Sequence, residues 1–144
     1  MERKYEFTGK TKTNDEGVTL HQIRSLRDFS EFKAGSLGGW IEKEENLSHE
    51  GNCWVYEDSQ VYEDSQVYGN SRVYGNSRVY GNSQIFGNSQ IIGNSLVYGD
   101  SQIFGNSRVY GDSQIFGNSR VYGDSQIFGK CSKTPIYIQR PPVS

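Results

Sequence analysis

Two histidines and two cysteines are the residues of this 144-residue chain best suited to chemistry. His49 stands beside Glu50 and four residues before Cys53, a cluster that could supply a general base. His21 lies in an alternating segment, where a half-exposed strand position is expected. With Cys131 far along the chain, the spacing suits no metal site. We therefore expect no catalytic residue and no metal ligand.

The other side chains that could bind a ligand occupy a repeated position. Five aspartates recur at that position and lack the Gly-Gly-x-Gly-x-Asp pattern of calcium-binding repeats: Asp58, Asp64, Asp100, Asp112 and Asp124. The sequence also has no phosphate-binding loop, dinucleotide motif or nucleophile elbow. We expect no cofactor.

A six-residue repeat sets where all of these side chains lie. From residue 55 to residue 132 the chain repeats VYGNSR or a close variant thirteen times without interruption. A unit this short cannot bury its own apolar side, so copies must stack into a solenoid. From residue 97 onward the repeats double into 12-residue copies, VYGDSQIFGNSR, which indicates internal duplication.

Each repeat reads as one short strand followed by one corner. In Ser-Arg-Val-Tyr, strand geometry places Ser and Val on the inner face and Arg and Tyr on the outer face. Gly-Asn, Gly-Asp or Glu-Asp then forms the bend, because these residues tolerate left-handed backbone angles. Cys53 and Cys131 stand in the Ser position at the two ends of the array, so both are expected to be small, buried and reduced, without a disulfide.

The length of a full turn follows from the charges. Like charges should not stack on each other one turn apart. A turn of 6 residues would place Arg72 over Arg78, a turn of 12 would place Arg108 over Arg120, and a turn of 24 would align two aspartates. A turn of 18 avoids every such pair and predicts these columns: Gln60, Arg78, Leu96, Gln114; Gln66, Gln84, Gln102, Arg120; and Arg72, Gln90, Arg108, Gln126.

The hexad, with an aliphatic residue first and Ser fifth, resembles the repeat of left-handed parallel β-helices. The resemblance implies an all-β, left-handed, three-sided solenoid, here with about 4–5 coils at 18 residues each. The segments KYEFTGKTKT and VTLHQIRSL, joined by NDEG, predict a β-hairpin that caps its N-terminal end. We expect a capping segment at 1–39, the β-helix at 40–132, and a final strand and tail at 133–144.

The aromatic second position of each repeat should form columns on the outside. These rings either stabilise the sheets by stacking or form an interface. The interface candidates are Tyr62, Tyr74, Tyr80, Phe86, Ile92, Leu96, Tyr98, Phe104, Tyr110 and Phe116, with Arg78, Arg108 and Arg120 between them. The face containing Ile92 and Leu96 is the most apolar, so a partner is expected to contact it first. A formal net charge of −2 argues against nucleic acid as that partner.

The N-terminal part carries a second resemblance. TLHQIRSLRDF followed by AGSLGGWIEKEENLSHEGNCWVYEDS is similar to the start of YdcK-like hexapeptide-repeat proteins of enteric bacteria, phages and prophages. The resemblance covers about residues 18–132 and then KCSKTPIYI, and it implies that a further C-terminal portion is absent here. Such proteins are often labelled transferases, and hexapeptide-repeat acyltransferases use a histidine base and a loop that breaks the coil.

Three functions remain open from the sequence. We favour a non-enzymatic, cytoplasmic, phage- or prophage-encoded scaffold that binds a protein, either a host factor or a second copy. The alternatives are an acyltransferase-like protein and an inhibitor of a host defence or nucleic-acid enzyme. No apolar run long enough for a membrane span is present, and no signal peptide is expected.

Overall fold

The structure of the chain is a computed structural model. It describes residues 3–111, 114–117, 120–121, 123, 126–128 and 137–138. Of Tyr110, Gln126, Phe128, Tyr137 and Ile138 only the backbone is described. Cys131 and the remaining residues after it lie outside this range, so the expectation for that cysteine is not tested.

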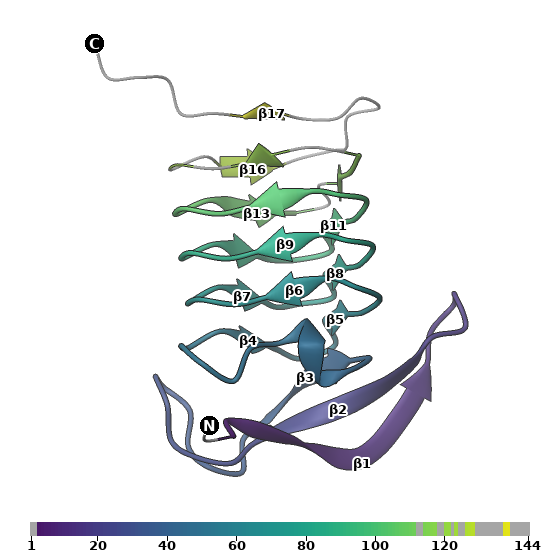
Figure 1. The fold of residues 1–144 in the computed structure, drawn as a ribbon, viewed down its shortest axis with the longest axis vertical. Coiled ribbons are helices and arrows are strands. Elements are labelled where there is room, and N and C mark those ends of the chain that lie inside the picture. The colour runs from purple at the N-terminus through teal and green to yellow at the C-terminus, as the bar shows by residue number, and fades with distance from the viewer. Residues whose placement is uncertain are drawn as a thin grey trace.

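Short parallel strands stack into a three-sided column above an N-terminal hairpin (Figure 1). One sheet has the order β1-β2-β3-β5-β8-β11-β14, the second β16-β13-β10-β7-β4 and the third β17-β15-β12-β9-β6. The repeat strands are β4 (Trp54–Val55), β5 (Gln60–Val61), β6 (Gln66–Val67), β7 (Arg72–Val73), β8 (Arg78–Val79), β9 (Gln84–Ile85), β10 (Gln90–Ile91), β11 (Leu96–Val97), β12 (Gln102–Ile103), β13 (Arg108–Tyr110), β14 (Gln114–Ile115), β15 (Arg120–Val121), β16 (Gln126–Phe128) and β17 (Tyr137–Ile138).

The register confirms the 18-residue turn. Arg78 pairs with Gln60 on one side and with Leu96 on the other, and Gln90 pairs with Arg72 and Arg108. Every predicted column of outward residues is reproduced in this way, including Gln102 opposite Arg120. Charge avoidance therefore identified the three-sided parallel solenoid correctly. Its left-handed sense stays an expectation that rests on the resemblance.

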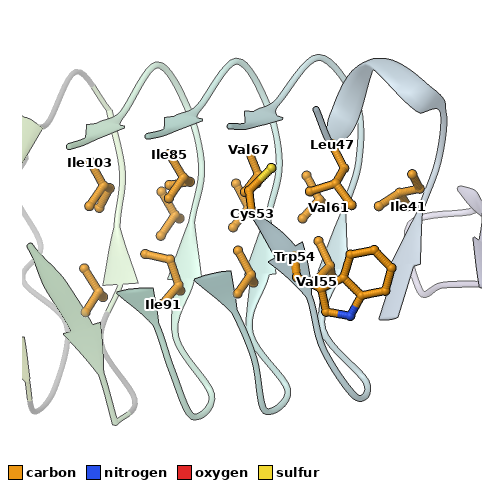
Figure 2. Close-up of a cluster of buried hydrophobic side chains, with 14 of the residues drawn as sticks. Ile41, Leu47, Cys53, Trp54, Val55, Val61, Val67, Ile85, Ile91 and Ile103 are labelled. Carbon is orange, nitrogen blue, oxygen red and sulfur yellow. The ribbon is translucent and has the colours of Figure 1, made fainter. Parts of the chain in front are cut away.

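The interior is a single column of aliphatic side chains and serines. The first-position residues from Val55 to Val121 are at most 1% exposed, and the serines from Ser59 to Ser107 are fully buried. Figure 2 shows Ile103, Ile85 and Val67 in one row along the axis. The Ser hydroxyls donate either to a carbonyl of their own corner, as Ser89 does to Phe86, or to a Gly carbonyl of the next turn, as Ser77 does to Gly93. Every buried serine hydroxyl in this run therefore donates to a backbone carbonyl.

Glycine in the bends is required for two reasons. The bend glycines from Gly69 to Gly123 have φ of 70–80°, a region that favours glycine. A Cβ on Gly75 would also lie 2.7 Å from the carbonyl oxygen of Gly93 in the next turn. Only Glu57 and Glu63 replace glycine at this position, and both keep positive φ, 57° and 59°.

The predicted hairpin is present, and it caps the coil. β1 (Tyr5–Thr13) pairs antiparallel with β2 (Thr19–Ser25), which pairs antiparallel with β3 (Leu37–Ile41). β3 then pairs in parallel with β5, so the cap continues the first sheet of the solenoid. Tyr5, Ile23 and Phe29 join the core cluster at this end, where they cover the N-terminal aliphatic layer of the solenoid.

The first turn is irregular in a way that the repeat pattern misses. After β3 comes a 3-10 turn, η1 (Glu44–Asn46), and then Leu47, which bridges Val67. Leu47 is fully buried in the position that a strict six-residue count assigns to His49. His49 and Glu50 are thus a two-residue insertion between Leu47 and the bend at Gly51. Figure 2 shows Leu47 continuing the row of Val67 and Ile85.

Two further expectations concern membrane spans and the boundaries of the three segments. Within the described ranges, no helix is long and apolar enough to cross a membrane. β3 starts at Leu37, inside the segment assigned to the cap, so the cap and the coil share a strand. The boundaries at 39 and 132 stay predictions.

Candidate functional site

The outer aromatic residues form two stacked columns. In the first, ring centroids are 5.0 Å apart for Tyr62 and Tyr80, 5.1 Å for Tyr80 and Tyr98, and 5.6 Å for Tyr98 and Phe116. In the second, Tyr68, Phe86 and Phe104 are separated by 4.9 Å at each step, with planes within 4° of parallel. Stacking at strand spacing holds each ring in place, so the surface is rigid before any partner arrives.

The third column is shorter. Tyr56 and Tyr74 are tilted by 31° with centroids 4.8 Å apart, and Ile92 replaces a ring one turn later. Ile92 follows β10, whereas Leu96 begins β11 on the next sheet. These two apolar residues therefore flank one corner of the prism rather than sharing one face. The side chain of Tyr110, the next member, is not among those described.

The aromatic interface candidates differ in how exposed they are. Tyr74, Tyr80, Phe86, Tyr98, Phe104 and Phe116 are half-buried, so an edge of each ring is open. Tyr62 is fully buried against Leu20 and Trp40, and its hydroxyl donates to Glu16 Oε1 at 2.8 Å. Tyr62 as an interface anchor is therefore wrong, because the hairpin covers the lower end of this column.

The arginines near the columns differ in the same way. Arg78 is half-buried, whereas Arg108 and Arg120 are exposed. Arg72 begins β7, on the sheet of the third column, and already contacts the cap: it pairs with Glu31 at 3.0 Å and donates to Ser30 at 3.0 Å. The upper part of the solenoid thus presents half-buried rings beside arginine and glutamine side chains.

A cavity of about 410 Å³ lies below the second column. Its lining includes Glu44, Glu45, His49, Glu50 and Tyr68. It forms where the inserted residues and the 3-10 turn push the chain outward. The repeat pattern could not reveal it, because it depends on a local departure from the repeat.

Both nitrogens of His49 are engaged. Nδ1 accepts a hydrogen bond from the backbone N–H of Lys4 at 3.0 Å, so the neutral ring carries its proton on Nε2. Nε2 lies 3.0 Å from Glu44 Oε1 and donates to it. Glu44 also pairs with Arg3 at 2.9 Å, and the Tyr5 ring stacks on the imidazole at 4.1 Å. In this arrangement His49 has no free lone pair with which to remove a proton.

Lys4 and Cys53 form a buried pair beside this site. Lys4 is fully buried, and its Nζ lies 2.7 Å from the carbonyl oxygen and 3.3 Å from Sγ of Cys53. Burial lowers the pKa of Lys4 and raises the pKa of the Cys53 thiol. Cys53 is free and buried, as the sequence predicted. A thiol shielded from solvent with a raised pKa is a poor nucleophile.

His21 is a strand residue, as expected. It lies in β2, is half-buried, and stacks on Phe7 with centroids 4.5 Å apart. In the described part of the chain, no group of three or more His, Cys, Asp or Glu is placed to hold a metal ion. The expectation of no metal rests on the sequence.

The repeats have known relatives. Residues 65–81 match the family described as "YdcK Beta solenoid repeat". A stretch of 58 residues is 38% identical to the protein named "Uncharacterized acetyltransferase YdcK" from Escherichia coli (strain K12). Residues 65–81 therefore resemble the YdcK repeat. The resemblance stated from the sequence is thus confirmed for the repeats. The stretch covers 40% of this chain and 18% of that protein, so the chain spans a small part of the relative it matches.

This relative also corrects one expectation. From the lack of a histidine and a loop in the array, we expected a protein without enzymatic activity. The relative is named an acetyltransferase, which points against that expectation, so it is withdrawn. The expectation considered only the array, whereas the structure places His49 at a pocket in the irregular first turn.

Proposed function

We propose that the chain is a β-solenoid binding module that contacts a protein partner through its stacked aromatic columns. The observation that carries the proposal is the pair of half-buried ring columns, Tyr80–Tyr98–Phe116 and Phe86–Phe104. Aromatic and arginine side chains are the commonest anchors of protein interfaces. Rings already fixed by stacking lose little conformational entropy when a partner binds.

The partner is either a second copy or another protein, and the proposal includes a cytoplasmic location and a phage or prophage origin. The corner between Ile92 and Leu96, on a third edge of the solenoid, adds aliphatic surface. Inhibition of a host defence or nucleic-acid enzyme is one form that such binding would take. Phage genes on either side of the coding region would support that form.

The experiment replaces Tyr80 and Tyr98 together with serine. We expect the variant to keep its thermal unfolding within a few degrees and to lose the partner. Light scattering reports self-association, and capture from cell lysate with wild type and variant side by side reports another protein. A matched control replaces Asp58 and Asn76, two exposed bend residues beside the third column, with serine. If the tyrosine variant unfolds, the rings are structural and the proposal fails.

Acyl transfer is a second candidate, favoured by the name of the relative and by the pocket beside His49. For His49 to act as a base, its Nδ1 must first release the backbone N–H of Lys4. Calorimetry with acetyl-CoA tests this candidate, with a His49→Gln variant as the comparison. Heat of binding that the variant loses supports it, and a flat trace at high concentration rejects it.

A further inference from the structure

The three aromatic columns end differently toward the N-terminus. The ring of Phe32 covers Tyr56, with centroids 5.2 Å apart. Tyr62 is covered by Leu20 and Trp40 of the cap. The second column ends at Tyr68, whose ring is half-buried and stacks on Phe86 on the side toward the next turn. Among the described side chains, no ring contacts its other side.

Ser48 occupies the place where the next ring of this column would stand. The backbone N–H of Ser48 donates to Val67 at 3.0 Å, just as that of Tyr68 donates to Ile85 at 2.9 Å one turn later. Ser48 is thus the equivalent of Tyr68 in the turn below, with a hydroxymethyl group where the columns above carry a ring. The cavity of about 410 Å³ is the room that this missing ring leaves.

The walls of the cavity specify what would fill it. The open face of Tyr68 is its roof, and Leu47 and Val67 contribute apolar surface. Three carboxylates, those of Glu44, Glu45 and Glu50, line the cavity as well. Glu44 is paired with Arg3, whereas Glu45 and Glu50 are exposed and form no ion pair in the described part of the chain. The site thus joins a flat π surface to unpaired negative charge.

A guanidinium group matches this combination. It is planar and stacks flat on an aromatic ring, while its N–H groups point outward in the same plane toward carboxylates. A lysine ammonium is a compact, strongly hydrated charge that cannot stack. A phosphate-bearing ligand such as a nucleotide would meet repulsion from the carboxylates.

We propose that the cavity below Tyr68 is a docking site for an arginine side chain of a partner protein. The guanidinium takes the place of the missing ring, stacks on Tyr68 and pairs with Glu45 and Glu50. This site lies at the capped end of the solenoid and does not depend on the proposed binding surface formed by the aromatic columns. Either one can fail without the other.

The test uses N-acetyl-arginine amide as the probe and amide chemical shifts of the whole protein as the readout. We expect saturable shifts centred on residues 47–50 and 66–68, with Kd on the order of 1 mM. N-acetyl-lysine amide and N-acetyl-citrulline amide should bind at least about fivefold more weakly, because one cannot stack and the other has no charge. Equal binding of all three, shifts centred elsewhere, or tighter binding of adenosine would overturn the proposal.

Three variants locate the site. Ser48→Phe supplies the missing ring, so it should weaken binding at least about tenfold while the thermal midpoint stays or rises. The double change Glu45→Gln with Glu50→Gln should weaken binding to a similar degree without filling the cavity. Asp58→Asn removes an exposed charge away from the cavity and should leave binding unchanged. If the two glutamates can be replaced without loss, the proposal is wrong, whatever the folding of the Ser48 variant.

Discussion

The carboxylate of Glu57 accepts a hydrogen bond from the backbone N–H of Gly75, one turn above it, with Oε1 3.0 Å from the nitrogen. Glu63 does the same for Gly81 at 2.9 Å. Both glutamates have left-handed backbone angles that a side chain rarely adopts. A side chain that reaches the next turn thus offsets the strain of its own bend.

This relationship predicts an unusual order of stability for variants of Glu57. Glu57→Ala keeps the strained backbone and loses the hydrogen bond, so the free energy of unfolding should fall by about 1 kcal/mol. Glu57→Gly also loses the bond but relieves strain of about 1 kcal/mol, so its loss should be smaller. Urea unfolding followed by circular dichroism gives both values. A glycine variant less stable than the alanine variant would contradict the account.

The glycine columns predict a contrast between two substitutions. Gly75→Ala places a Cβ 2.7 Å from the Gly93 oxygen at a φ of 79°, so stability should fall by about 2 kcal/mol or more. Gly17→Ala has a similar φ, 81°, but nothing within 4 Å, so only the strain of about 1 kcal/mol applies. Thermal unfolding of the two variants side by side measures the difference. Equal losses would show that contact between turns adds nothing.

Asn46 should be among the polar residues that tolerate substitution least. It is fully buried; its side-chain oxygen accepts from the backbone N–H groups of Glu42 and Lys43, and its nitrogen donates to the carbonyls of Glu63 and Ser65. Asn46→Ala removes all four hydrogen bonds, with only the Glu42 N–H keeping a second partner among the described residues, the Val61 carbonyl, and should destabilise the protein by about 3 kcal/mol. Chemical denaturation measures it, with Asn82→Ala on the exposed surface as control. A loss equal to that of the control would refute the bonding role.

Alkaline pH should unfold the protein through its buried tyrosines. Burial raises the pKa of Tyr5, Tyr56 and Tyr62 above the ordinary value of 10.0. Above that pH the unfolded chain loses these protons while the folded chain keeps them, so stability is full below pH 10.0 and falls as pH rises. The lowered pKa of Lys4 acts in the opposite sense, but only below 10.5.

Absorbance at 295 nm measures this ionisation directly. Folded protein should show a delayed fraction of its ten tyrosines, released together with the loss of the circular dichroism signal. In denaturant all ten should ionise near their ordinary value. A single early transition in the folded protein would contradict the burial of these hydroxyls.

The sequence predicted the solenoid because its information is periodic. Arg72 with Arg78 excludes a turn of 6 residues, Arg108 with Arg120 a turn of 12, and Asp100 with Asp124 a turn of 24. The remaining turn of 18 residues is the one that the structure has. The inward serines and the glycine bends follow from residue types alone. The hairpin was also predicted, since its strands and turn lie close together in the chain.

The candidate site was harder to predict, because it arises where the period breaks. A strict count places His49 inside the coil, whereas burial of the larger apolar Leu47 moves it outward. The sequence around Tyr62 does not distinguish it from the other aromatic residues of the array, but a cap that is distant in sequence covers its ring. Contacts of this kind depend on tertiary packing, which a local pattern does not contain. The spacing of eight residues between Leu47 and Val55 was the available signal.

The three-sided turn has a consequence for how such a gene changes. One hexad covers one face, so a duplicated 12-residue copy advances two faces and its successor starts on a different side. Every repeat offers a valine or an isoleucine to the interior, so recombination between copies keeps the core intact. The outward residues, by contrast, move to a different face of the prism after each duplication. Unequal recombination between repeats can therefore generate new surface patterns in a single step, with little effect on folding.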